Sequence, residues 1–356
     1  MVENLISMIH ELISIPAPSG NEDDLAFFIT KTLIRESHDI SKDKLGNLVV
    51  KSCHAVEQHS RIALLAHMDE IFAVVQKIES DGFVRIKPAP GMSLRDLYGR
   101  TVLVKTFAGW IPGKVVAIPN HLTKQEYDHI IPKDLYVDVG LGSKNEIEKA
   151  GLYIGAPVVF PREFFTAHNK LFGPALDDRV GIAVLLDLIY NSDLLKHAVV
   201  IFSAKEEYLL RGSVPALRAV NPEIIICVDA HLAFDTPYLL SFGSDVRLGA
   251  GPVFSVYSFH GKGAVIGTVQ STRVVEKMAK IAANKGLPLQ LSVSEGIVSE
   301  GAYGQLEGRG ATVIEVGFPL RYAHTGVEVC DIIDVHVLKR LLEALVVDEL
   351  VYDLVR

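Results

Sequence analysis

The stretch Val199–Ser213, VVIFSAKEEYLLRGS, places two adjacent carboxylates, Glu206 and Glu207, near the end of a predicted strand. The run from Val199 to Ala204 is apolar or small throughout, which predicts a buried strand. Removing two neighbouring carboxylates from water is costly unless another group compensates their charge. Because a metal ion is the usual compensating group, this stretch predicts a metal-binding site at a strand end.

Other acidic residues and histidines also follow apolar runs elsewhere in the chain. These candidate ligands are His67 and Asp69 after RIALLA, Asp177 and Asp178 in FGPALDDRVG, Asp229 after EIIICV, and His324 in FPLRYAHTG. Oxygen and imidazole ligands without thiolates are typical of a catalytic metal centre rather than of a structural zinc site. Taken singly, each has an ordinary alternative, such as a structural histidine for His67 or a helix cap for Asp177-Asp178. The glutamate pair could likewise form a solvated turn.

The composition is that of a globular protein long enough for two domains. The chain has 356 residues, of which 49% are hydrophobic and 22% are charged. Its formal net charge of -8 argues against a general nucleic-acid binder, and no apolar run reaches the ~20 residues of a membrane span. Three widely spaced cysteines argue against a disulfide framework, and the first residues lack the pattern of a secretory signal. We therefore expect a cytoplasmic protein without nucleic-acid or membrane partners.

Strands and helices alternate in the two outer parts of the chain, residues 1–70 and 163–356. Apolar runs at 199–204 and 224–228 predict strands, and the periodic stretch 179–190 predicts a helix before them. This alternation predicts an α/β domain with a mostly parallel sheet and helices on both faces. In such sheets ligands bind at the carboxyl ends of strands, which is where the candidate ligands lie.

The middle of the chain, residues 71–162, is instead rich in predicted strands. Residues 72–80 and 83–89 flank Asp81-Gly82, which predicts a β-hairpin with a two-residue turn. The one helix expected in this part is short and lies at 144–150. We interpret 71–162 as a β domain inserted into the α/β domain.

Five motifs occur in order along the chain, and together they resemble the M42 family of metallo-aminopeptidases. They are AHMDEI at 66–71, GPALDDRVG at 173–181, KEE with RG between 205 and 212, VD with DTP between 228 and 237, and RYAHT at 321–325. Each motif is weak alone, but all five at this spacing are specific, and the resemblance covers nearly the whole chain. It implies the fold of the co-catalytic zinc peptidases, with a PDZ-like domain at 71–162. It also implies a large homo-oligomer, a dodecamer in the TET-like members.

The resemblance implies two divalent ions per subunit, zinc or cobalt, held by five side chains. In the family pattern His67 and Asp229 bind one ion, Glu207 and His324 bind the other, and Asp177 bridges both. The three carboxylates and two neutral imidazoles carry a charge of -3 against +4 from the ions. The residual +1 favours a bound hydroxide, because metal binding lowers the pKa of water to about 7.

The resemblance also implies roles for two residues that are not ligands. Glu206 would be the general base, and Asp69 would orient His67 by accepting its second ring hydrogen. The peptide bond after the bridging aspartate is often cis in this family, so we expect a cis bond at Asp177-Asp178. The implied reaction removes N-terminal residues from short peptides by attack of a metal-bound hydroxide.

Three alternative interpretations of the function exist for this pattern of residues. A deacylase or carboxypeptidase of a related fold would keep the metals and change the substrate, and a non-catalytic relative would have lost a ligand. A glycosidase would need two carboxylates about 5 to 9.5 Å apart across a sugar bond, which adjacent glutamates serve poorly. The chain departs from the family pattern at Phe72, Tyr208 and Glu300-Gly301-Ala302, which leaves the substrate preference open.

Overall fold

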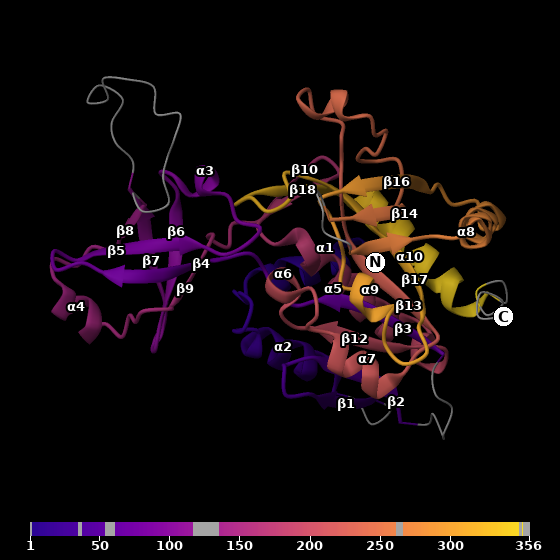
Figure 1. Ribbon diagram of the computed structural model, residues 1–356, viewed down its shortest axis with the longest axis horizontal. Helices are drawn as coiled ribbons and strands as arrows, with labels where there is room; N and C mark the ends of the chain where they lie inside the picture. The colour runs from indigo at the N-terminus through magenta and orange to yellow at the C-terminus, as the bar shows by residue number, and fades with distance from the viewer. Residues whose placement is uncertain are drawn as a thin grey trace.

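The computed structural model describes residues 2–34, 38–53, 61–116, 135–260, 266–348 and 351. Its main feature is a large sheet covered by helices, with a small barrel projecting to one side (Figure 1). Along the sheet the strands are β1 (His38–Lys42), β2 (Leu48–Ser52), β12 (Val199–Ser203), β3 (Ile62–His67), β13 (Ile224–Leu232), β17 (Thr312–Arg321), β18 (Glu328–Asp331), β11 (Lys170–Gly173) and β10 (Phe165–Ala167). A branch made of β14 (Val253–Phe259), β15 (Gly267–Val269) and β16 (Gln290–Glu295) joins this sheet through β17.

The sheet is parallel only at its centre, so the prediction of a mostly parallel sheet is wrong. The four central strands β12, β3, β13 and β17 run parallel, as do β14 and β16. The other seven pairings among the described strands are antiparallel. The reason lies in the connections, because strands joined by a short turn, such as β10 and β11, can only be antiparallel, whereas parallel neighbours need a long crossover.

Helices cover both faces of the sheet, as predicted. One face packs against α1 (Val2–Ile13), α2 (Asp23–Leu33), α5 (Leu176–Asn191), α8 (Thr272–Asn284) and α10 (Ile332–Val347). The other face packs against the short helix α7 (Val214–Val220), with α9 (Gly301–Gly304) beside it. Nearly all of α5 is buried, which explains why its sequence is apolar all round.

The strand-rich middle of the chain forms a closed barrel with its own apolar core. In order around the barrel the strands are β4 (Ala73–Ile78), β5 (Phe83–Pro88), β8 (Tyr136–Asp138), β7 (Gly109–Val115), β6 (Thr101–Thr106) and β9 (Pro157–Val159), and two short helices accompany them, α3 (Leu94–Leu97) and α4 (Lys144–Lys149). The barrel lies within the predicted segment 71–162, but the domain boundaries and the PDZ-like assignment stay predictions. The predicted two-residue turn is wrong. The N–H of Glu79 donates to the carbonyl of Phe83, so the loop between the two strands has three residues, 80–82.

An ion pair ties together the two points where the chain enters and leaves the barrel segment. The carboxylate of Glu70 accepts two hydrogen bonds from Arg162, at 2.9 and 2.6 Å. The buried guanidinium of Arg179 lies 3.2 Å from the same carboxylate and also donates to the carbonyl of Met68. Both ends of the barrel segment are therefore linked to the start of α5, where Arg179 lies. Among the described residues, no helix is long and apolar enough to cross a membrane.

Candidate metal centre

The predicted ligands converge on one pocket at the carboxyl ends of the central strands. The pocket has a volume of about 610 Å³, and all five predicted ligands and Glu206 line it. His67 ends β3, Asp229 lies near the end of β13, Glu206 and Glu207 begin α6 (Glu206–Leu209) after β12, His324 follows β17, and Asp177 lies in the first turn of α5. The structure therefore brings together residues that are up to 257 positions apart in sequence (324 − 67).

Asp177 lies between the two histidines and presents one oxygen to each. Its Oδ1 is 3.0 Å from Nε2 of His67, and its Oδ2 is 3.7 Å from Nε2 of His324. Asp229 lies on the His67 side, with 3.8 Å between Oδ1 and Nε2. Glu207 lies on the His324 side, with 3.2 Å between Oε2 and Nε2. This arrangement has the shape of two ligand sets that share one carboxylate.

The donor atoms are close enough together to hold cations. One ligand atom each from His67, Asp177 and Glu207 lie within 4.8 Å of one another, and the same is true of Asp177, Asp178 and Asp229. All donors are carboxylate oxygens or imidazole nitrogens, which suit zinc and cobalt. The residues present therefore fit the divalent metal that the sequence predicts.

The electrostatics of the cluster also favour a cation. Burial raises the pKa of Glu206 and of Asp229 well above the usual range, and neighbouring carboxylates raise both further. Burial alone would lower the pKa of His324, but the nearby Glu207 and Asp177 raise it to about 10. An excess of buried carboxylates thus draws positive charge into the pocket, and a divalent ion would meet the same demand.

The start of α5 shows how one sequence pair serves two purposes. The Asp177-Asp178 peptide bond is cis, as predicted. Asp177 faces the pocket, while Oδ1 of Asp178 accepts the N–H of Gly181 at 3.0 Å in the first helical turn. Asp177 thus lies where the metal-ligand interpretation expects it, and Asp178 makes the contact that the helix-cap interpretation expects.

Comparison with known proteins agrees with this geometry. The sequence profile of the M42 glutamyl aminopeptidase family matches residues 46–341. The chain belongs to this family. It is 29% identical over 351 residues to a lysyl aminopeptidase of Pyrococcus furiosus, covering 95% of each chain, and 29% identical to a putative aminopeptidase, SgcX, of Escherichia coli, covering 95% of this chain and 92% of that one.

Solved structures of aminopeptidases share the whole fold. An aminopeptidase of the archaeon Desulfurococcus kamchatkensis superposes with a TM-score of 0.90 at 29% identity, covering 99% of this chain and 98% of that one. The TET1 peptidase of Pyrococcus horikoshii, which can assemble into a tetrahedron or a large octahedral shell, superposes with a TM-score of 0.82 at 28% identity, covering 96% and 99%. As a member of the M42 family, the protein is a peptide hydrolase of a metal-dependent family.

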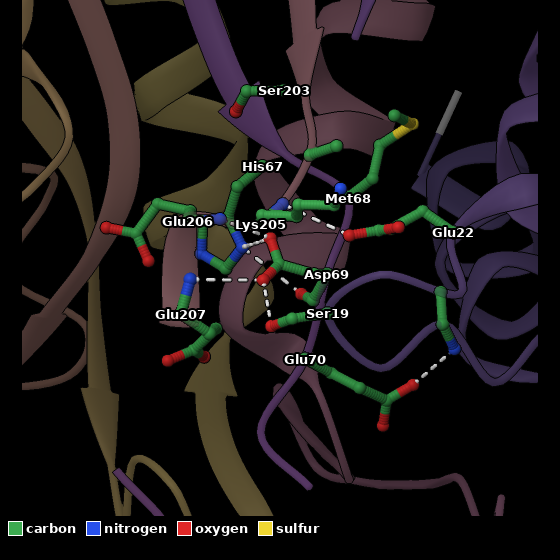
Figure 2. A network of polar contacts seen from close by, with 12 residues as sticks. Ser19, Glu22, His67, Met68, Asp69, Glu70, Ser203, Lys205, Glu206 and Glu207 are labelled. Atoms are coloured by element: carbon green, nitrogen blue, oxygen red, sulfur yellow. Dashed lines mark hydrogen bonds and ion pairs between the residues drawn. The ribbon is translucent and has the colours of Figure 1, made fainter. Parts of the chain in front are cut away.

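Asp69 lies beside His67 as predicted, but its carboxylate does not take the predicted hydrogen bond. Nδ1 of His67 contacts the backbone carbonyl of Asp69 at 3.1 Å, whereas the carboxylate Oδ1 is 3.7 Å away. The carboxylate instead accepts the backbone N–H groups of Glu206 at 2.8 Å and Glu207 at 3.1 Å, and the hydroxyl of Ser19 (Figure 2). In this M42 chain Asp69 therefore positions the histidine through its main chain and the two glutamates through its side chain.

Two further side chains support the turn that carries the glutamate pair. Glu22 accepts the N–H of Lys205 at 3.1 Å, and Lys205 has a left-handed backbone with φ of 64° (Figure 2). Asn47 accepts the N–H of Ala204 at 2.8 Å. The sequence pattern Ser19-x-x-Glu22 is typical of a capping box, but here Ser19 and Glu22 serve this turn instead.

Glu328 is a functional candidate that the sequence analysis did not identify. Its carboxylate accepts the N–H of Asp177 at 3.1 Å and the N–H of His324 at 2.8 Å, so it connects the loops of two predicted ligands. Burial raises its pKa to about 8, and the charge of Asp177 contributes. The only sequence signal is a glutamate between two valines in a strand, a pattern that also fits an exposed edge. His231 and His260, which match no motif, also line the pocket.

Proposed function

We propose that this protein is a dinuclear metal-dependent aminopeptidase that removes N-terminal residues from short peptides. In this proposal His67 and Asp229 would hold one divalent ion, Glu207 and His324 would hold the other, and Asp177 would be a ligand of both. Zinc or cobalt bound there would polarise the scissile carbonyl and lower the pKa of a water molecule. The observation that carries the proposal is Asp177, whose two oxygens face the two histidines.

The adjacent glutamates divide the chemistry between them. Glu207 approaches His324 and completes a ligand set, whereas Glu206 lines the pocket with its carboxyl group buried. A carboxylate that lines the pocket beside the proposed ligands can accept a proton in one step and return it in the next. Glu206 takes the proton of the attacking water and then gives it to the leaving amine. Asp69 keeps both glutamates in place through their backbone N–H groups.

The barrel segment 71–162 supports assembly and access rather than chemistry. It contributes Pro90 and Gly91 to the pocket wall but none of the proposed ligands. Since the TET1 relative assembles into large shells, we propose a large homo-oligomer for this chain too, with a dodecamer as the first candidate. Light scattering at working concentration tests this, and a monomer would contradict it.

One experiment tests the proposed reaction. Dialysis against a chelator should abolish hydrolysis of a peptide with a free N-terminus, and added zinc or cobalt should restore it. Acetylation of the same peptide should strongly reduce kcat/KM. Full activity in metal-free protein would refute the metal mechanism, and equal cleavage of both peptides would favour a deacylase or an endopeptidase.

A further inference from the structure

A second, much smaller cavity adjoins the main pocket. The two share the wall residues Asp229, Ala230, His231 and Ile297. The centre of a water-sized group can occupy only about 10 Å³ of it, which is room for one such group. The cavity thus lies beside a proposed metal ligand and has room for one small group.

The strand register brings several polar residues to the walls of this side cavity. Glu315 of β17 pairs with Cys227 of β13, two residues before the pair of Gly317 and Asp229. Two residues along a strand span about 7 Å, so Glu315 lies at that depth below Asp229. Ser255 follows the paired residues of β14 and lies at the same level, and further serines complete the wall. These are Ser258, Ser294 and Ser299.

Two side-chain polar atoms in the walls of this cavity have no hydrogen-bond partner among the described residues. They are Nε2 of His231 and Oγ of Ser255, whose residues are 7% and 1% exposed. Glu315 is 2% exposed, and its Oε1 accepts a hydrogen bond from Ser299 at 2.7 Å. Because buried polar atoms without partners are costly, the cavity is built to receive a polar group.

We infer that the side cavity receives the ammonium group of an N-terminal lysine, with Glu315 as its counter-charge. This inference rests on the proposed aminopeptidase function and names its substrate class. An ammonium is as compact as the available space and offers three donors to the carboxylate and the serine hydroxyls. The planar guanidinium of arginine exceeds the room for one water-sized group, and a carboxylate would face Glu315 with like charge.

The route to this cavity suits the stem of a lysine. Leu232, Ile297 and Val298 line the main pocket, and Ile297 also borders the side cavity. A four-carbon stem can lie along these apolar side chains while its head enters the polar space. Its length is comparable to the depth of about 7 Å between Asp229 and Glu315.

A substrate panel with one matched pair of variants tests this. The metal-loaded enzyme is assayed on lysyl, arginyl, leucyl and glutamyl nitroanilides, and kcat/KM is compared. We expect lysine to exceed leucine by about 10-fold or more, because a charge-assisted hydrogen bond discriminates by that order. Glu315→Gln, which keeps the shape and an acceptor for Ser299, should lower the lysine-to-leucine ratio about 10- to 100-fold.

Asp334→Asn is the control for the loss of a buried carboxylate. Asp334 is 0% exposed and accepts the N–H groups of Gly249 and Gly251, both at 2.7 Å, but it lines neither the main pocket nor the side cavity. This variant should leave the lysine-to-leucine ratio unchanged. The inference is overturned if the wild-type enzyme cleaves leucyl as well as lysyl substrates, or if Glu315→Gln changes both equally. If no free-amine substrate is cleaved, the proposed function itself fails, and this inference fails with it.

Discussion

The division of labour between the two adjacent glutamates can be tested by replacing each with glutamine. Glu206 is 5% exposed, and its backbone N–H is held by Asp69 at 2.8 Å, a bond that Glu206→Gln leaves intact. The amide cannot accept the proton of the attacking water, so kcat should fall while two ions remain bound. Loss of a general base costs ~10²–10⁴-fold in rate, which corresponds to about 3–5.5 kcal/mol of barrier.

The substitution Glu207→Gln should reduce activity for a different reason, the loss of a bound metal ion. Oε2 of Glu207 lies 3.2 Å from Nε2 of His324, and Glu207→Gln removes the negative charge of that ligand set. The metal content should therefore fall from two ions per chain toward one, with activity partly restored at high metal concentration. Glu307→Gln, at an exposed ion pair with Arg218, is the control for charge removal and should change neither quantity.

Metal analysis beside steady-state kinetics decides between these outcomes. If Glu206→Gln loses an ion while Glu207→Gln keeps two and loses only rate, the two roles are reversed. If neither substitution changes rate or metal content, the dinuclear mechanism is wrong for this protein.

Three further predictions follow from other buried carboxylates. Asp69→Asn should lower kcat by at least 10-fold with little change in KM. Three donors now reach the two oxygens of the carboxylate, and the single amide oxygen of asparagine cannot accept all three hydrogen bonds. Unchanged kinetics would reject the positioning role. Arg162→Met should destabilise the fold by about 3 kcal/mol in denaturant unfolding, because Arg179 is then the one charged partner left to the buried Glu70 among the described residues, whereas Glu307→Gln at a surface pair should cost about 0–1 kcal/mol. Burial raises the pKa of Asp334 from 3.8 to about 6, so the folded state binds this proton more tightly than the unfolded state does. The unfolding free energy should therefore fall as the pH rises between these two values. If the unfolding free energy of the wild type and of Asp334→Asn changed equally with pH over this interval, the prediction would be contradicted.

The sequence alone predicted the α/β class, the strand-rich middle segment and six of the residues that line the pocket. These features depend on local patterns, namely apolar runs, helical periodicity and polar residues at strand ends. The partners of individual side chains could not be predicted in this way. Ser19 and Glu22 have the spacing of a capping box, yet the fold brings Asp69 and Lys205 within reach, and these contacts replace it. Local spacing cannot reveal a competing partner that is far away in the chain.

The predicted ligands lie together in one pocket although the sheet around them differs from the prediction. Five of the six predicted pocket residues lie in or after the carboxyl-terminal parts of β12, β3, β13 and β17, which are neighbours in that order and form the parallel centre of the sheet. Parallel neighbours end at the same edge, so residues after these strands must meet, whatever the direction of the flanking strands. Asp177 joins them because α5 packs directly on β3 and β13. The antiparallel pairing of β14 with β17 adds the branch with β14 and β16, whose serines line the side cavity beside Asp229. The predicted metal centre therefore depends on the parallel centre of the sheet, whereas the inferred lysine preference depends on Glu315 of that centre together with the serines of the branch.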